Sequence, residues 1–258
     1  MKNTITAGGQ AITTQALNEI PLRIFIGYDS HETVAYHVLA HSILSRATCP
    51  VSLIPLNIKG LGHLYTRGRG PTEATEFSLT RFLVPFLSGY EGWSIFMDCD
   101  MLCLTDIGKI WKAISHADWQ PPAKSSHAVY VCQHNYVPKT ETKFLGQQQT
   151  KYPRKNWSSF MVFNNKACEA LTPRYVNSAT GLELHRFAWT TDDQIGSLPL
   201  TWNWLVDEYD QPILTPEVLH YTLGGPYFDD YVACDYAAEW FAEKKAMLGE
   251  TIGETRRI

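Results

Sequence analysis

Apolar and polar positions alternate along the first part of the chain in blocks of strand and helix length. Residues 22–27 and 51–56 are apolar runs bounded by turn residues, which predicts two buried strands. Between them, Val34, Val38, Leu39 and Ile43 recur with the spacing of one helix face. A strand, a helix and a strand in this order form a βαβ unit, and such a unit implies a parallel sheet.

The later blocks continue this alternation. We predict strands at residues 93–97, 101–104, 159–163 and 218–221, and helices at residues 77–87, 106–114 and 231–248. Residues 57–75 form a long, glycine-containing polar stretch, and a loop of this length is usually functional or mobile. Residues 116–158 are also polar, and no strand is predicted there. Because the chain shows no internal repeat and no clear linker, we expect a single α/β domain.

Composition restricts the class of protein further. The chain has 258 residues, of which 45% are hydrophobic and 19% charged, as in soluble globular proteins. Its net charge of −4 argues against a broad nucleic-acid interface, so we expect no nucleic-acid partner. The six cysteines are scattered without a Cys-X-X-Cys pair, which favours reduced thiols and a cytoplasmic location.

The N-terminal sequence and the hydropathy of the chain predict where the domain begins and how it relates to membranes. Residues 1–20 contain few large apolar side chains and lack the features of a secretory signal, so we expect a flexible tail. The domain is then expected to span residues 21–258. No segment approaches the ~20 apolar residues of a membrane span, which leaves peripheral contact as the only membrane association we expect.

The strand at residues 93–97 ends in Asp98-Cys99-Asp100, the most informative triplet in the chain. Two carboxylates this close repel each other unless a cation lies between them. A hard divalent ion with a preference for oxygen ligands is the simplest such cation, and a diphosphate is a natural further ligand of that ion. Roughly 0.5 Asp-X-Asp triplets are expected by chance in a chain of this composition, so a structural turn is the alternative interpretation.

The order of motifs along the chain resembles the GT-A nucleotide-sugar transferases, in particular the retaining family of glycogenin and the bacterial lipopolysaccharide galactosyltransferases. Five stretches carry this resemblance: residues 25–29, 77–81, 96–100, 193–194 and 220–227. Each match is short, but the ordered set covers residues 22 to about 230. The resemblance implies a GT-A (Rossmann-like) α/β fold, with a mixed, mostly parallel sheet flanked by helices.

The resemblance also implies a set of site residues. Asp98, Asp100 and His220 would hold Mn²⁺, with Mg²⁺ as the alternative; two carboxylates and one imidazole suit Mn²⁺ better. The alternative for His220 is a hydrogen-bonded histidine at a strand end. The nucleotide sugar would contact the following residues: Gly27, Tyr28, Asp29, Arg81, Cys99, Trp157, Ser158, Gly224 and Gly225.

Several of these residues have a second interpretation. Asp29 would meet the base and Tyr28 would stack on it, although Asp29 is also placed to cap the following helix. Arg81 would face the donor, or would form an ion pair with Glu76 or another carboxylate. Cys99 would bring backbone close to the ribose.

Asp193 and Gln194 resemble the pair that surrounds the transferred sugar. Gln194 would lie beside the anomeric centre, opposite the leaving group, and Asp193 would hold sugar hydroxyls. Alternatively, Asp193 caps a helix, and Asp192 competes with it for either role.

Two departures from the family pattern affect the donor site. The usual His-X-X-Gly-X-Lys-Pro-Trp reads His220-Tyr-Thr-Leu-Gly-Gly-Pro-Tyr227, so the lysine that contacts the diphosphate is absent. We expect Arg67, Arg69 or another cation to replace it. The usual Asn-Ala-Gly reads Trp157-Ser158-Ser159, which affects the identity of the donor sugar.

The sequence therefore predicts a metal-dependent glycosyltransferase. It would move a hexose from a nucleotide diphosphate sugar, with UDP as the expected nucleotide, to the hydroxyl of a glycan or other acceptor, with retention of configuration. Polysaccharide biosynthesis is the expected setting. The alternatives are a nucleotidyltransferase, a metal-dependent hydrolase and a non-catalytic sugar- or nucleotide-binding relative. The turn at residues 27–32 lacks the Lys or Arg that a nucleotidyltransferase normally presents there.

Overall fold

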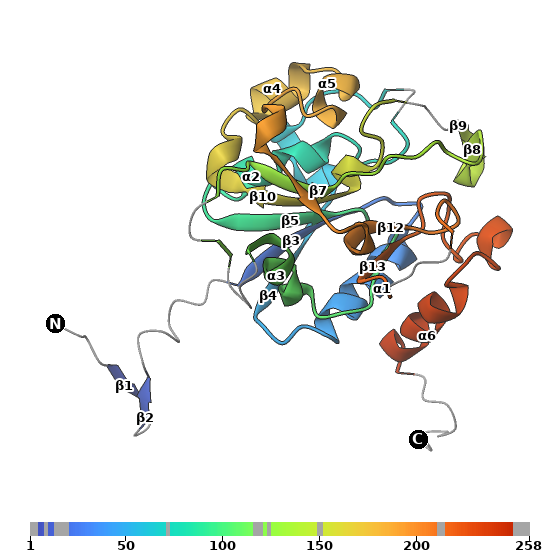
Figure 1. Ribbon diagram of the computed structural model, residues 1–258, viewed down its shortest axis with the longest axis horizontal. Coiled ribbons are helices and arrows are strands. Elements are labelled where there is room, and N and C mark those ends of the chain that lie inside the picture. Colours follow the sequence, from blue (N-terminus) through green and yellow to red (C-terminus); the bar gives the residue numbers. More distant parts are fainter. Residues whose placement is uncertain are drawn as a thin grey trace.

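The computed structural model describes residues 5–7, 10–12, 21–70, 73–115, 121–122, 125–148, 152–210 and 215–249. At its centre lies a six-stranded sheet with the order β11-β7-β10-β5-β3-β4 (Figure 1). Its strands are β3 (Leu22–Gly27), β4 (Val51–Leu56), β5 (Trp93–Met97), β7 (Val129–Cys132), β10 (Phe160–Asn164) and β11 (Ile195–Leu198). Within this sheet only β10 runs antiparallel to its neighbours. The predicted mixed, mostly parallel sheet is confirmed.

A smaller sheet lies beside the main one and receives the chain as it leaves β5. It consists of β6 (Met101–Cys103), β12 (Trp204–Leu205) and β13 (Val218–His220), in the order β12-β13-β6. β5 and β6 are separated only by residues 98–100. The aspartate triplet therefore lies where the chain passes from one sheet to the other.

Helices flank the main sheet, as predicted. They are α1 (Thr33–Leu44), α2 (Val84–Leu87), α3 (Ile110–Ser115), α4 (Pro173–Ser178), α5 (Gly181–His185) and α6 (Ala237–Met247). In the view of Figure 1, α4 and α5 lie above the sheet, and α1 and α3 lie below it. α1 also packs on α6, where Val38 and Trp240 share a small apolar cluster. The carboxylate of Glu243 on α6 pairs there with His41 at 2.5 Å and with Arg46 at 2.7 Å.

The core explains why the strand runs are so apolar. Ile24, Ile95, Phe96, Val131 and Val162 are all fully buried in one cluster that extends across the main sheet. A central strand of a sheet that is covered on both faces has no solvent-exposed side, so its sequence is continuously apolar rather than alternating.

Several elements differ from the sequence-based expectation. The helix predicted at 77–87 is a turn, a 3₁₀ segment (Thr80–Leu83) and the single turn of α2. The helix predicted at 231–248 begins only at Ala237, because Tyr236 adopts a left-handed conformation with φ 58°. β7 and β11 were not predicted.

Two short hairpins complete the described structure. β1 (Ile5–Ala7) pairs with β2 (Gln10–Ile12) inside the expected N-terminal tail, whose other residues lie outside the described ones. β8 (Thr142–Lys143) pairs with β9 (Gln147–Gln148), and Figure 1 shows this hairpin at the upper right edge of the molecule. Among the described residues, no helix combines the length and the hydropathy that a bilayer crossing requires.

Candidate functional site

Asp98 and Asp100 are fixed by backbone hydrogen bonds on both sides of the triplet. The amide of Asp98 donates to the carbonyl of Ser159 at 3.0 Å, and the carbonyl of Asp100 accepts from the amide of Tyr221 at 2.9 Å. The second bond ties the triplet to the end of β13. Both carboxylates are largely buried, and Asp100 is only 8% exposed.

His220 is brought to the triplet by strand register. It ends β13 and pairs with Met101 of β6, so its ring lies beside Asp100, with Nε2 at 3.3 Å from Asp100 Oδ1. One ligand atom from each of Asp98, Asp100 and His220 lies within 4.8 Å of the other two. The structure thus brings together the three residues that the sequence suggested as metal ligands.

Asn203 orients the ring of His220. Its side-chain amide donates to Ser159 Oγ at 2.8 Å, which leaves its Oδ1 to accept a hydrogen bond from His220 Nδ1 at 2.9 Å. When the ring is neutral, this bond keeps the hydrogen on Nδ1, and the lone pair of Nε2 then points to the carboxylates. Metal-binding histidines normally use this arrangement, in which the second ring nitrogen donates to a protein acceptor.

Arg81 neutralises part of the carboxylate charge. Its Nη1 lies 2.8 Å from Asp98 Oδ1 and donates to the carbonyl of Ser158 at 2.9 Å. Its guanidinium also lies over the rings of Phe77 and Phe96, with its central carbon 5.3 and 4.9 Å from the ring centroids. Of the two interpretations of Arg81, the ion pair is therefore present, and its partner is Asp98 rather than Glu76.

In the triplet itself, burial and the neighbouring positive charges shift the carboxyl pKa values in opposite directions. Burial raises the pKa of Asp98 to about 6, although Arg81 opposes the shift. Burial also favours the neutral form of Asp100, but the neighbouring His220 outweighs it and lowers the pKa of that carboxyl. Behind the triplet, burial together with the nearby Asp100 raises the pKa of Glu32 to about 8.

The metal-ligand candidates and Arg81 line a cavity of about 520 Å³. Arg81, Asp98, Asp100, Ser158 and His220 are the predicted site residues on its wall. The other lining residues are Glu73, Ala74, Thr75, Ser78, Leu79, Lys143, Phe144, Tyr152, Lys155, Asn156, Ser159, Thr180, Gly181, Leu182, His185 and Thr222. A volume of this size is typical of small-molecule sites.

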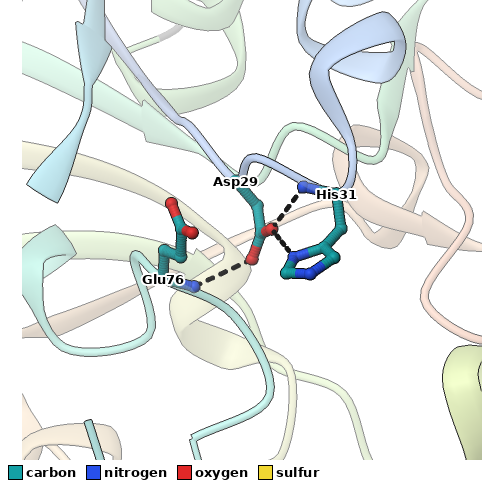
Figure 2. A group of neighbouring side chains, drawn as sticks. All are labelled: Asp29, His31 and Glu76. Atoms are coloured by element: carbon teal, nitrogen blue, oxygen red, sulfur yellow. Dashed lines mark hydrogen bonds and ion pairs between the residues drawn. The ribbon is translucent and has the colours of Figure 1, made fainter.

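Asp29 lies at the end of β3 but outside the lining of this cavity. Figure 2 shows how its carboxylate is used: Oδ1 accepts from the amide and from Nδ1 of His31, both at 2.9 Å, and Oδ2 accepts from the amide of Glu76 at 2.9 Å. It does not cap the helix, because the residue before α1 is Glu32, which forms no side-chain cap hydrogen bond. Asp29 instead ties the backbone at Glu76 to the turn that follows β3.

The neighbours of Asp29 pack closely. Tyr28 shares a hydrogen bond with Thr33 Oγ1 at 3.2 Å, and its ring meets Tyr36 edge-on. A Cβ at Gly27 would lie 2.4 Å from the ring of Phe77, so only glycine fits there.

The remaining predicted donor contacts lie around the triplet and the turn after His220. Cys99 is buried with its Sγ 4.0 Å from Glu32 Oε2, and Trp157 Nε1 donates to the carbonyl of His134 at 2.9 Å. Gly224 and Gly225 follow β13 after three intervening residues. None of these four residues lines the cavity.

Asp193 and Gln194 lie in a 3₁₀ turn (Asp192–Gln194) before β11. Gln194 Oε1 accepts from Thr190 Oγ1 at 2.8 Å, and Asp193 is exposed. Asp192 pairs with Arg154 at 2.6 Å. The pair is not part of the cavity wall, and its predicted role stays a prediction.

The structure adds residues that the sequence analysis missed. His185 on α5 shares a 2.7 Å hydrogen bond with Ser158, and burial lowers the pKa of its ring to about 3. Lys143 and Lys155 bring positive charge to the cavity wall. The sequence does contain one indication of the role of Asn203. An asparagine between two tryptophans in an apolar run is expected to be buried, and a buried amide needs a hydrogen-bond partner.

Neither arginine suggested as a phosphate contact lines the cavity. Arg67 donates to the carbonyls of Val176 and Ala179, and Arg69 donates to those of Glu73 and Ala74. Both guanidinium groups thus brace the loop at residues 57–75.

Solved structures define the class of the fold. The chain is similar to the WbbM bifunctional glycosyltransferase (TM-score 0.59, 14% identity, 94% of this chain and 54% of that one). It is also similar to the glycosyltransferase GlyE of Streptococcus pneumoniae, with a TM-score of 0.57 and 12% identity over 90% of this chain and 63% of that one. For the galactosyltransferase LgtC the TM-score is 0.54 and the identity 11%, over 90% of this chain and 98% of that one. The protein has the GT-A glycosyltransferase fold, and it spans about half of WbbM and less than two thirds of GlyE.

No protein-family model matches the chain. The sequence is, however, 44% identical to Protein CDI of Arabidopsis thaliana over 233 residues, which is 86% of each protein. The chain belongs to the family of Protein CDI.

Proposed function

We propose that this protein is a metal-dependent glycosyltransferase that moves a hexose from a UDP-sugar to an acceptor hydroxyl with retention of configuration. The observation that carries this proposal is the cluster of Asp98, Asp100 and His220 at the wall of a 520 Å³ cavity in a GT-A fold.

The three side chains fit a divalent cation. Two carboxylate oxygens and one imidazole nitrogen suit Mn²⁺, with Mg²⁺ as the alternative. His220 already has its Nδ1 hydrogen bonded to Asn203, so its Nε2 needs no rearrangement to act as a ligand. When bound, the ion would supply positive charge to the diphosphate leaving group.

The other candidate residues would hold the donor. We assign the base and ribose to Gly27, Tyr28, Asp29 and Cys99, and the diphosphate and sugar to Arg81, Trp157, Ser158, Gly224 and Gly225. Asp193 would hold sugar hydroxyls, and Gln194 would lie beside the anomeric carbon. Since the transition state carries oxocarbenium character, a neutral amide at that carbon would stabilise it without forming a bond.

Retention follows when the acceptor attacks the face from which the diphosphate leaves. The leaving phosphate oxygen can then accept the proton of the acceptor hydroxyl, so no separate general base is needed. Among the described side chains of the cavity wall, Asp98 is paired with Arg81 and Asp100 is held against His220, which fits this route.

A cytoplasmic protein in polysaccharide or glycan assembly is the setting we propose. The acceptor would be a glycan or another hydroxyl compound, and any membrane contact would be peripheral.

A ligand screen with a matched control tests the proposal. UDP, GDP, CMP and their sugars are compared by calorimetry with Mn²⁺ and with EDTA, on wild type, Asp100→Ala and Asp106→Ala. Asp106 is a suitable control because it is also 8% exposed, but it caps a 3₁₀ turn by accepting from Gly108. We expect Mn²⁺-dependent binding of a nucleoside diphosphate that only Asp100→Ala abolishes, together with transfer or slow hydrolysis of the sugar. If no nucleotide binds to wild type with any metal, the proposal is wrong.

A further inference from the structure

Lys143 is one of three cations on the cavity wall, beside Arg81 and Lys155. It lines the same cavity as Asp98, Asp100 and His220, and it takes part in none of the ion pairs found within the described residues. Its ammonium lies 5.2 Å from the ring centroid of Phe144. Burial lowers the pKa of Lys143, whereas the charges of Asp100, Glu32 and Asp98 act against that shift.

Two contacts fix Lys143 at this place. The amide of Phe144 donates to the carbonyl of Leu223 at 2.7 Å, and the Phe144 ring stacks on Phe228 with centroids 5.1 Å apart and planes 13° apart. Leu223 and Phe228 belong to the segment that follows His220. The β8–β9 hairpin is therefore anchored to the same segment that positions the imidazole.

The turn after His220 cannot itself supply a cation at its glycines. A Cβ at Gly225 would lie 2.2 Å from Tyr227 Cε1, and one at Gly224, where φ is 147°, would lie 2.6 Å from Tyr231 Cδ2. Both positions therefore exclude a lysine or arginine side chain. Lys143 brings positive charge to the cavity wall from another segment, the β8–β9 hairpin.

The charges of the cavity wall indicate the charge of the ligand that would fit it. The wall carries three acids (Glu73, Asp98 and Asp100) and three bases (Arg81, Lys143 and Lys155), which balance. A divalent ion at the Asp98–Asp100–His220 cluster would leave two positive charges in excess. The diphosphate of a nucleotide sugar is doubly negative, so it would restore the balance.

We propose that Lys143, supplied by the β8–β9 hairpin, binds the diphosphate of the nucleotide-sugar donor next to the metal site. This inference rests on the proposed function, because it requires a diphosphate ligand and a metal in this cavity. It assigns the phosphate contact to a segment that lies almost eighty residues before the turn after His220.

The test separates two binding events on Lys143→Met. Mn²⁺ alone is titrated first, and UDP is then titrated in saturating Mn²⁺, both by calorimetry. We expect UDP to bind about tenfold to a hundredfold more weakly than to wild type, as for the loss of a hydrogen bond to a charged group. Mn²⁺ alone should bind equally well or more tightly, because a cation that repels the metal has been removed.

Lys139→Met is the matched control. Lys139 lies on the same segment, but its ammonium is exposed and 3.6 Å from Asp210, outside the cavity. We expect this variant to bind Mn²⁺ and UDP like wild type, and Lys143→Arg to keep more UDP affinity than Lys143→Met.

The outcomes distinguish this inference from the proposed function. If wild type binds UDP with Mn²⁺ and Lys143→Met binds it equally well, Lys143 does not contact the diphosphate, and the function proposal stands. If Lys143→Met loses Mn²⁺ and UDP affinity in equal measure, its role is to hold the site together, and the inference is again wrong. If wild type binds neither UDP nor GDP with Mn²⁺, the proposed function is wrong, and the inference that rests on it is wrong as well.

Discussion

Replacing Asn203 by leucine tests whether the orientation of His220 makes the cluster a metal site. Asn203 is fully buried, and its side chain bonds His220 Nδ1 at 2.9 Å, Ser159 Oγ at 2.8 Å and the carbonyl of Asn156 at 3.3 Å. Leucine has nearly the same volume but can form none of these bonds. The ring of His220 then loses the acceptor that keeps its hydrogen on Nδ1.

The expected loss has two separable parts. Leaving His220 Nδ1 without a partner should lower the free energy of unfolding by about 1–3 kcal/mol. Freeing the ring to change its tautomer or to rotate should weaken Mn²⁺ binding about tenfold to a hundredfold, which corresponds to about 1.4–2.8 kcal/mol. Urea unfolding measures the first quantity, and Mn²⁺ calorimetry on the folded protein measures the second.

Asn165→Leu controls for the loss of a buried asparagine. Asn165 is also fully buried and forms two side-chain hydrogen bonds, with Ser94 Oγ at 2.7 Å and with the carbonyl of Glu91 at 3.0 Å, but it does not line the cavity. It should lose comparable stability and retain full Mn²⁺ affinity. Equal Mn²⁺ affinity in the two folded variants would refute the role assigned to Asn203.

The sequence was sufficient for the strands that are continuous and apolar. β3, β5 and β10 appear as predicted because each is a mostly buried, apolar run covered on both faces. β4 was also predicted, although it is the half-buried edge strand of the sheet. β11 was missed because its four residues include Gly196 and Ser197, and β7 because it is a four-residue strand inside a polar stretch. β7 joins the sheet through long-range pairing with β10, and β11 joins it through pairing with β7, which a local pattern does not reveal.

The site was predictable to the extent that its residues are neighbours in the chain. Asp98 and Asp100 are two residues apart, and a resemblance over the ordered motifs added His220. Asn203 and Lys143 reach the same cluster through strand pairing and hairpin docking, 17 and 77 residues before His220. Such contacts depend on the tertiary fold, so motif spacing does not identify the partners of either residue; the sequence indicates only that Asn203, an asparagine in an apolar run, needs a buried partner.

Two further variants test packing and electrostatics away from the metal cluster. Gly225→Lys should not improve UDP binding and should lower the melting temperature, because its Cβ would lie 2.2 Å from the ring of Tyr227; tighter UDP binding in a folded variant would contradict this. Glu243→Gln should cost about 1 kcal/mol of stability at pH 7, since Glu243 joins α6 to Arg46 and His41 of the α1 region. Burial alone would raise the pKa of Glu243, but its bonds to Arg46 and His41 outweigh burial and lower it in the folded protein. The stability from a lowered pKa is complete above the unfolded value of about 4.3 and is lost as the pH falls through the folded value. The melting temperatures of wild type and Glu243→Gln should therefore differ at pH 7 and converge as the solution is made more acidic than pH ~4. A difference that stays constant down to the lowest pH at which both proteins fold would show that Glu243 acts through packing rather than through its charge.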